Sequence, residues 1–312
     1  MKKDLAKSKV AVVICTVQLN DCYVKSLKSL AKNTYGSWEL IIVDQSNDGR
    51  IRKTSEETMR KYNRKIRITY IKDGGHGLSR ARNIGWKNSR AQYVCFTDDD
   101  AYVDKNWLRM IVDTFEDDES VGIVGGKIIP TYEEVNENWQ IPEQWEYILP
   151  SFDQGNKVSP YLNGSLPPGV NYSVRRRLLQ KFGGFDERLG VNSKRKIQIT
   201  GEDTYFSLRV LTAGYKIIYN PRVKVYHPVS LARQNLSFLK RRLFSEGVTD
   251  IYIKMINRNL GCFFRIRMLM DSLRSIVKLY LNKDSMDRAV YEGTLSRLHG
   301  VVYCLTLYGF IR

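Results

Sequence analysis

Three consecutive aspartates, Asp98, Asp99 and Asp100, follow the apolar run Tyr93–Thr97. Carboxylates packed this closely repel one another unless a cation compensates their charge. Mg²⁺ and Mn²⁺ prefer oxygen ligands and usually share them with substrate phosphates. We therefore predict a divalent metal site at this cluster. The alternative is a solvated acidic turn that caps the next helix.

A second acidic pair, Glu202 and Asp203, opens a predicted helix at Gly201–Ala213. A carboxylate within hydrogen-bond reach of a hydroxyl can act as a general base. Capping explains the pair equally well, because the helix dipole favours acids in the first turn. Asp44 ends another apolar run and could accept hydrogen bonds from a nucleobase or a ribose, although such a residue alone more often forms a turn.

Basic and imidazole groups could complement these acids. His227 ends a β-branched run, where it could complete a metal site or contact phosphate, whereas a lone histidine is more often structural. Arg80 and Arg82 follow the glycine-rich loop Gly74–Gly77 and could meet phosphate charge, with surface solvation as the alternative. The loop itself is not a dinucleotide fingerprint, because it lacks the strand–GxGxxG–helix order.

Alternating strands and helices must position these residues. Apolar runs predict buried strands at Val10–Val17, Glu39–Asp44, Ile66–Ile71 and Tyr93–Thr97, with helices between them. That alternation builds a mostly parallel sheet of Rossmann type with helices on both faces. Ligands bind such sheets at the carboxyl ends of the strands, so we expect Asp44 and the three aspartates to converge.

The rest of the chain divides into a looser half and a helical tail. We predict short strands at Gly169–Val174, Tyr215–Tyr219 and Val223–Tyr226. The expected organisation is an α/β domain over residues 1–232, with one half at about 1–100 and the other at about 101–232. Residues 233–312 form a C-terminal α-helical extension.

The net charge of +17 indicates an anionic surrounding or substrate. Residues 233–312 hold 14 basic and 6 acidic residues, a net charge of +8. Within them, residues 260–281 predict an amphipathic helix. The apolar side of this helix consists of Phe263, Ile266, Leu269, Leu273 and Ile276. The basic residues around that side are Arg265, Arg267, Arg274 and Lys278. Two explanations stay open: packing on the catalytic domain, or peripheral attachment to an anionic membrane surface.

Other features narrow the location. No apolar run reaches the roughly 18 residues that a membrane span needs, so we do not expect an integral membrane protein. The basic residues before Val10–Val17 only loosely resemble a signal peptide, and the run is better explained as a buried strand. The five cysteines are odd in number and scattered, which favours reduced thiols over disulfides or zinc. We expect a cytoplasmic protein, peripheral at the inner face of the membrane if the tail attaches there.

Eight motifs in order resemble family 2 glycosyltransferases. They are VAVVICT (10–16), IIVDQSNDG (41–49), GLSRARNIG (77–85), FTDDD (96–100), GVNYSVRR (169–176), GGFDERLG (183–190), GEDTYFSLRVLTAGY (201–215) and VKVYHP (223–228). One motif would be weak, but eight in the right order over residues 10–228 are highly specific. The resemblance implies a GT-A-like fold and inverting, metal-dependent transfer of a sugar from a nucleotide-sugar, usually a UDP-sugar. It makes residues 1–232 the catalytic domain, with a nucleotide-binding half at about 1–100 and an acceptor half at about 101–232.

The resemblance also implies roles for individual residues on the donor side. Thr16 and Asp44 would hold the base and Asp98 would face the ribose, with Asp99 beside it and Arg82 near the nucleotide. Two departures stand close by, since Gln45 replaces a frequent second acid and Cys15 replaces a usual proline. They make the base contact of Asp44 less certain.

For catalysis, the resemblance makes Asp203, beside Glu202, the base that activates the acceptor hydroxyl. Asp100 would bind the metal, Mn²⁺ or Mg²⁺, with Asp98 and His227 as its neighbours in the metal site. Asn171 would line the sugar or acceptor pocket. The acceptor would be a glycan or a lipid-linked sugar in polysaccharide or glycolipid synthesis.

Three other functions remain to be weighed. The charge of +17 suggests a nucleic-acid-binding protein, but a basic-aromatic recognition motif is missing and the acidic cluster would oppose a phosphate backbone. We therefore expect no nucleic acid partner. A non-catalytic family member would not need intact DDD and ED elements. A metal-dependent nucleotidyltransferase would release pyrophosphate instead of a nucleoside diphosphate.

Overall fold

A computed structural model describes residues 8–62, 66–258, 262–283 and 286–307, and for residues 258, 262–265 and 307 it describes the backbone alone. The chain forms two compact units. Unit 1 comprises Met1–Thr131, Pro150–Lys194 and Glu202–Pro228. Unit 2 comprises Tyr132–Leu149, Arg195–Gly201 and Val229–Arg312.

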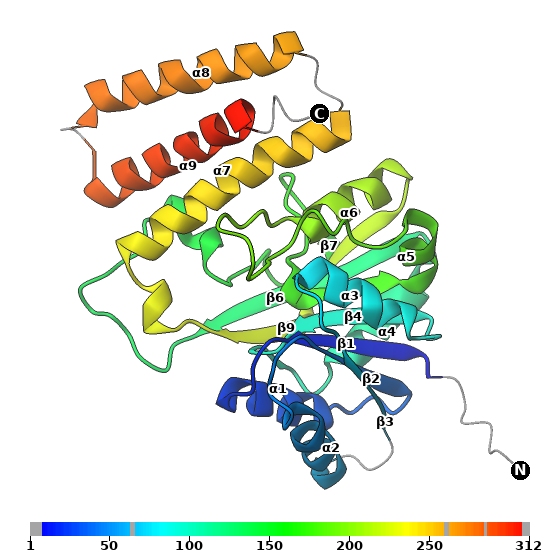
Figure 1. Ribbon diagram of the computed structural model, residues 1–312. Coiled ribbons are helices and arrows are strands. Elements are labelled where there is room, and N and C mark those ends of the chain that lie inside the picture. The colour runs from blue at the N-terminus through cyan, green and yellow to red at the C-terminus, as the bar shows by residue number, and fades with distance from the viewer. Residues whose placement is uncertain (1–7, 63–65, 259–261, 284–285, 308–312) are drawn as a thin grey trace, which may run out of the picture. The chain divides into compact units, whose positions relative to one another are not determined.

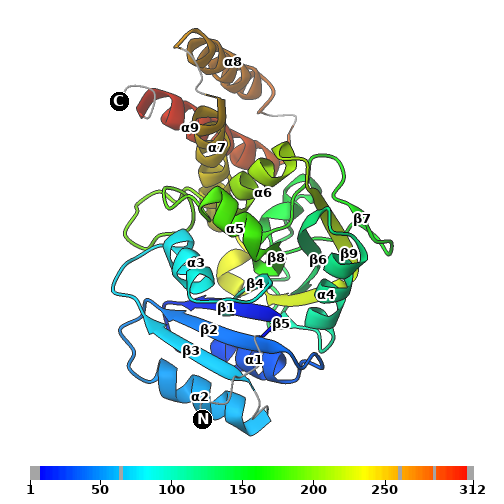
Figure 2. The same cartoon turned by 90° about the vertical axis from the view of Figure 1, so that its right-hand side faces the viewer.

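One mixed sheet forms the centre of unit 1, in the strand order β3-β2-β1-β4-β8-β6-β9-β5 (Figures 1 and 2). The parallel half consists of β1 (Val10–Thr16), β2 (Trp38–Asp44), β3 (Arg67–Lys72) and β4 (Tyr93–Asp98). The other half consists of β8 (Tyr172–Arg175), β6 (Val121–Thr131), β9 (Lys216–Pro228), β5 (Tyr102–Val103) and β7 (Ser159–Pro160). Strand β8 is antiparallel to both β4 and β6, whereas β9 is parallel to β6.

Helices cover both faces of this sheet (Figure 2). The helices of unit 1 are α1 (Asp21–Ala31), α2 (Ile51–Tyr62), α3 (Leu78–Lys87), α4 (Trp107–Asp117), α5 (Arg176–Phe182) and α6 (Glu202–Thr212). Alternate residues of β1 enter two cores: Val12 packs with α1, α2 and α4, and Val13 packs with α3, α5 and α6. Burial on both faces explains the continuous apolar run of β1. The predicted α/β class is confirmed.

Local differences from the sequence prediction have simple causes. The two strands predicted around residues 215–226 are one strand, β9, because a register shift between Gly126 and Ile128 of β6 absorbs the irregular segment at Asn220. The Asn220 amide is buried and donates to Thr114 Oγ1 at 2.8 Å. Helix α1 is capped by Asn20, whose side chain accepts from the Tyr23 amide at 2.9 Å.

Unit 2 contains three long helices, α7 (Leu236–Arg258), α8 (Cys262–Leu281) and α9 (Arg288–Leu307). Helices α7 and α9 pack closely at two glycines. A Cβ added at Gly300 would lie only 2.1 Å from the Phe244 carbonyl oxygen, and one added at Gly247 only 2.1 Å from the Arg297 carbonyl oxygen. The short helix Glu143–Ile148 contributes Trp145 to the core beside Leu239 and Leu243 of α7. Within the part of the chain that the structure describes, no helix is both long enough and apolar enough to span a bilayer.

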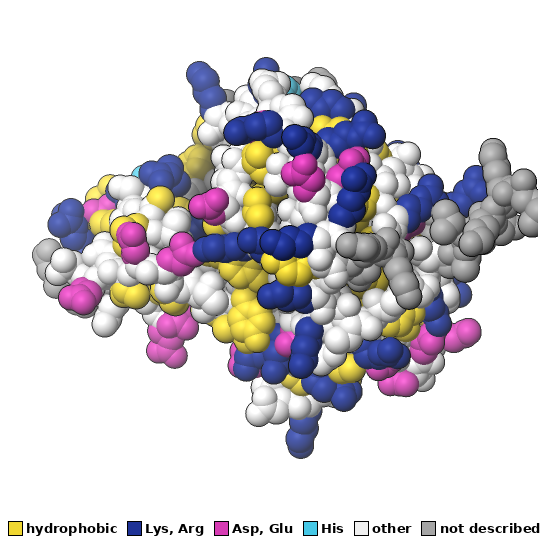
Figure 3. All heavy atoms as spheres, turned by 90° about the horizontal axis from the view of Figure 1, so that it is seen from below, with side chains coloured by type: hydrophobic (Ala, Val, Ile, Leu, Met, Phe, Trp, Pro, Cys, Tyr) yellow, Lys and Arg dark blue, Asp and Glu magenta, His cyan; other side chains and the backbone are white. Residues whose placement is uncertain are grey.

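Basic residues are widely distributed over the surface. On the face shown in Figure 3, Lys and Arg side chains lie over much of the surface, with Asp and Glu side chains among them. In unit 2, Lys240 pairs with Glu292 at 2.5 Å and Arg242 with Glu246 at 2.8 Å. A part of the positive charge therefore serves internal ion pairs and is not free for a partner.

Candidate active site

Two distant segments meet at a possible metal site. Tyr102 of β5 pairs with Tyr226 of β9. Asp100 lies two residues before Tyr102 and His227 one residue after Tyr226, so this pairing brings Asp100 next to His227. Asp98, at the end of β4, joins them, and one ligand atom of each of these three residues lies within 4.8 Å of the others. The sequence predicted these three residues as the metal-binding group, and the structure brings them together.

The hydrogen bonding of His227 suits a cation. Its Nδ1 lies 3.0 Å from the Pro228 carbonyl oxygen, which can only accept, so Nδ1 carries the hydrogen. In the neutral ring, Nε2 then presents its lone pair 3.5 Å from a carboxylate oxygen of Asp100. A cation placed between these two atoms would be bound by both. Two carboxylates and one imidazole form a donor set that binds Mn²⁺ or Mg²⁺, so these residues fit the expected ion.

Burial and the acidic cluster both act on the pKa of Asp99. Burial raises the pKa of Asp99 to about 7, and the neighbouring charges of Asp100 and Asp98 add to the rise, although a hydrogen bond with Thr16 opposes it. Thr16 is the last residue of β1 and is buried between the ends of β2 and β4. The strand ends thus bring Thr16 to the aspartates, as the sheet order predicts.

Arg82 joins the two acidic motifs. Its guanidinium lies 2.6 Å from a carboxylate oxygen of Glu202 and 3.3 Å from one of Asp98, and the residue is only 3% exposed. The central carbon of the Arg82 guanidinium lies over the rings of Phe96 and Phe185, 5.9 and 5.8 Å from their centroids. The surface-solvation alternative for Arg82 is therefore wrong. A contact between Arg82 and the nucleotide stays a prediction.

The acidic pair of α6 is divided between two environments. Burial and the charge of Asp203 raise the pKa of Glu202 to about 7, although the charge of Arg82 lowers it. Asp203 instead accepts backbone hydrogen bonds from Gly169 at 2.6 Å and Thr204 at 2.7 Å. A Cβ at Gly169 would lie 2.7 Å from the Arg82 guanidinium, so any larger residue there would displace the Arg82 side chain. Asp203 is consequently fixed in orientation, with lone pairs left for another donor.

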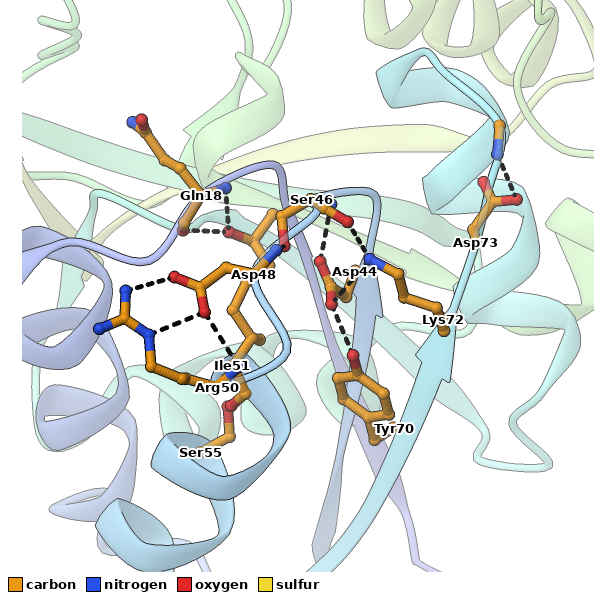
Figure 4. A network of polar contacts seen from close by, with 12 residues as sticks. Gln18, Asp44, Ser46, Asp48, Arg50, Ile51, Ser55, Tyr70, Lys72 and Asp73 are labelled. Carbon is orange, nitrogen blue, oxygen red and sulfur yellow. Dashed lines mark hydrogen bonds and ion pairs between the residues drawn. The ribbon is translucent and has the colours of Figure 1, made fainter.

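Asp44 is the centre of a polar network at the end of β2 (Figure 4). It has no exposed surface and accepts from the Ser46 amide at 2.7 Å, the Tyr70 hydroxyl at 2.5 Å and the Lys72 ammonium at 3.3 Å. Burial alone would raise the pKa of Asp44, but the hydrogen bonds from Tyr70, Ser46 and Lys72 outweigh it and lower the pKa. Asp44 is thus an ionised anchor for the loop after β2.

The end of β3 contributes residues that the sequence analysis did not select. Asp73 is buried and accepts from Arg80 at 3.0 Å and from the Gln45 amide at 2.8 Å. Gln45 is the residue that replaces a frequent acid in the motif, and here its amide ties the β2 and β3 loops together. Lys72 is the last residue of β3 and Asp73 directly follows it, so the strand-end rule that selected Asp44 would have found them too.

Asn171 is placed inside the protein. It is fully buried, accepts from the Trp107 indole at 2.9 Å, and donates to the carbonyl oxygens of Val223 at 2.9 Å and Lys127 at 3.2 Å. These bonds connect α4, β6 and β9. Its assignment to the sugar or acceptor pocket stays a prediction.

Solved structures share this fold. The mannosyltransferase PcManGT from Pyrobaculum calidifontis, in complex with GDP-Man and Mn²⁺, aligns with a TM-score of 0.64 at 14% identity, covering 98% of this chain and 89% of that one. GalNAc-T7 with UDP, GalNAc and Mn²⁺ aligns with a TM-score of 0.55 at 17% identity, covering 78% of this chain and 48% of that one. At these identities the likeness shows the GT-A fold alone.

Sequence relatives lead to the same class of protein. A glucosyl-dolichyl phosphate glucuronosyltransferase of Haloferax volcanii is 23% identical over 282 residues, which are 86% of this chain and 87% of that protein. The succinoglycan biosynthesis protein ExoM of Rhizobium meliloti is 27% identical over 183 residues, 58% of this chain and 54% of that protein. Residues 11–183 match the sequence profile of glycosyl transferase family 2. The chain therefore belongs to glycosyl transferase family 2.

Proposed function

We propose that this protein is an inverting, metal-dependent glycosyltransferase that moves a sugar from a nucleotide-sugar, a UDP-sugar in our assignment, to an acceptor hydroxyl. The observation that carries the proposal is the group Asp98, Asp100 and His227, whose ligand atoms lie within 4.8 Å of one another. Asp203 of the same unit supplies a fixed carboxylate at the start of α6.

Asp98, Asp100 and His227 would hold the divalent ion. A bound Mn²⁺ or Mg²⁺ would stabilise the negative charge of the departing nucleoside diphosphate. The network around Asp44 would support the base pocket, with Thr16 and Asp99 on the donor side. Tyr70 and Lys72 fix the Asp44 carboxylate, so the residues that would support a base pocket are already held in place without a donor.

Asp203 would accept the proton of the attacking hydroxyl. Its two backbone hydrogen bonds hold the carboxylate in one orientation, which a general base needs. Glu202 is engaged by Arg82, so it is the less available of the two acids. Direct attack on the anomeric carbon in one displacement inverts its configuration without a covalent intermediate.

For the acceptor, we propose a lipid-linked sugar or a growing cell-surface polysaccharide. The glucuronosyltransferase relative is named for a dolichyl phosphate sugar, and another relative is named for succinoglycan biosynthesis. A lipid-linked acceptor would bring the enzyme to the cytoplasmic face of a membrane.

The test is a panel of UDP- and GDP-sugars, assayed with and without Mn²⁺ for release of the nucleoside diphosphate. We expect chelator-sensitive release from one donor, and NMR of the product should show the inverted anomer. Release of pyrophosphate would instead identify a nucleotidyltransferase.

Asp100→Ala provides the decisive variant for the metal. We expect it to remove Mn²⁺-dependent UDP binding and transfer while its circular dichroism spectrum stays unchanged. Asp117→Ala, at the exposed end of α4, is the matched control and should remain active. Full turnover of Asp100→Ala, or of the wild type in excess chelator, contradicts the metal assignment.

A further inference from the structure

Helix α8 has an exposed apolar stripe. Ile266, Met270, Leu273, Val277 and Leu281 are between 42% and 81% exposed. Their spacing of three or four residues places them on one face of the helix, because an α-helix turns by about 100° per residue. Large apolar side chains lined up in this way on a surface indicate an interaction site, whereas scattered ones do not.

The opposite side of α8 is already occupied within unit 2. Helix α9 lies between α7 and α8 (Figure 1), and Leu279 of α8 is buried. The ring of Tyr280 contacts that of Tyr291 of α9, with centroids 6.1 Å apart. The exposed stripe is therefore a second apolar face, additional to the one that holds α8 in its unit.

Basic residues border the stripe along one side. Arg267, Arg274 and Lys278 each come one position after a stripe residue, so they lie about 100° further around the helix. Asp271 is the one acid between residues 266 and 281, and its carboxylate lies 3.3 Å from the Arg274 guanidinium. The segment 266–281 thus carries three basic residues against one acid, a net charge of +2.

We propose that this face of α8 attaches the enzyme to a bilayer containing acidic lipids. The helix would lie in the plane of the interface, with the stripe among the acyl chains and the basic border at the headgroups. The charge decides between this occupant and a second copy of the chain. Two α8 helices would bring like charges together, whereas an acidic bilayer complements them. The inference extends the proposed function, but it does not depend on the donor or on the catalytic residues.

The test is cosedimentation of the full-length protein with vesicles of pure phosphatidylcholine or of phosphatidylcholine with 30% phosphatidylserine (about one acidic lipid in three). We expect binding to the acidic vesicles only, and a marked loss in high salt. Each basic residue near an acidic surface contributes about fivefold to partitioning, so Arg274→Gln with Lys278→Gln should weaken binding by roughly 30-fold.

The apolar contribution is tested by Leu273→Glu with Val277→Glu, which should abolish binding. Both positions are exposed, so the fold should survive. Leu231→Glu is the matched control, because Leu231 is 43% exposed and Leu273 is 42% exposed, and this variant should bind as the wild type does. Donor hydrolysis without vesicles should be equal in all variants, which separates a failure of attachment from a failure of the catalytic assignment.

Two results would overturn the proposal. The first is equal binding to neutral and acidic vesicles, or none to either. The second is a dimer in light scattering without lipid that Leu273→Glu with Val277→Glu converts to a monomer, because the face would then belong to a second copy.

Discussion

Arg82 lies between the acids of two motifs, and its replacement by methionine is the sharpest test of how this site is held. The Arg82 and Glu202 side chains are 4% and 6% exposed and 2.6 Å apart, so Arg82→Met leaves a buried carboxylate without its cation. Removing one partner of a buried pair costs about 3–5 kcal/mol of unfolding free energy. The Asp98 contact is longer, at 3.3 Å, and Asp98 is 34% exposed, so its loss adds at most about 1 kcal/mol.

Urea unfolding at pH 7 measures this loss. Arg80→Met is the matched control on the same helix: Arg80 is 45% exposed, and Asp73 keeps its hydrogen bonds from the Gln45 side chain and the Gly75 amide, so the expected cost is smaller, about 1 kcal/mol. Since burial and Asp203 already raise the pKa of Glu202 to about 7, and removal of Arg82 raises it further, the folded variant keeps a proton that the unfolded chain releases. The loss should therefore grow above pH 7, by up to about 1.4 kcal/mol per pH unit.

A double-mutant cycle with Glu202→Gln isolates the pair. In the Glu202→Gln background the cost of Arg82→Met should fall, and its growth above pH 7 should disappear, because no carboxyl group is left at this position to lose a proton. If Arg82→Met costs no more than Arg80→Met, or if the cycle shows no coupling, the reasoning about a buried clamp is refuted.

Three further predictions follow from the site and the helical unit. Asp203→Asn should keep donor binding and lower kcat by roughly 10²–10⁴-fold in steady-state kinetics, whereas normal turnover together with a dead Glu202→Gln would exchange the two roles. Glu202 has a folded-state pKa raised from 4.5 to about 7, so its contribution to stability is full below pH 4.5 and lost as the pH rises to 7. Glu202→Gln should consequently flatten the urea-unfolding profile between these values, and an unchanged slope would contradict the assigned shift. Gly300→Ala should destabilise by about 1–3 kcal/mol in thermal unfolding, because its Cβ would lie 2.1 Å from the Phe244 oxygen, while Gly36→Ala, which meets nothing within 4 Å, should be neutral.

Much of the parallel half of the sheet could be predicted from local sequence. Runs such as Val10–Cys15 and Leu40–Val43 are apolar throughout because both faces of their strands are buried. That pattern requires only neighbouring residues and is legible without a structure. It also places Asp44 and Asp98 at strand ends, and parallel pairing brings those ends to one edge of the sheet.

The antiparallel insertion was not legible in this way. Strand β8 lies between β4 and β6, although its residues 172–175 come long after both in the chain. Short strands carry little periodicity, and the pairing partner of a strand is a non-local choice. The sequence motifs implied that His227 serves the metal, but only the pairing of β5 with β9 brings it to Asp100.

The same distinction applies to Arg82 and to α8. An arginine on a helix after a glycine loop has the same local signature whether it is exposed or buried, and only the approach of α6 and β4 encloses Arg82. In α8 the sequence grouped Ile266, Leu269, Leu273 and Ile276 on one apolar side, and Phe263 and Arg265 lie outside the described side chains. The structure leaves Ile266 and Leu273 exposed while Leu269 and Ile276 are partly covered, because helical periodicity defines an apolar face but the position of α9 decides which part of it is buried.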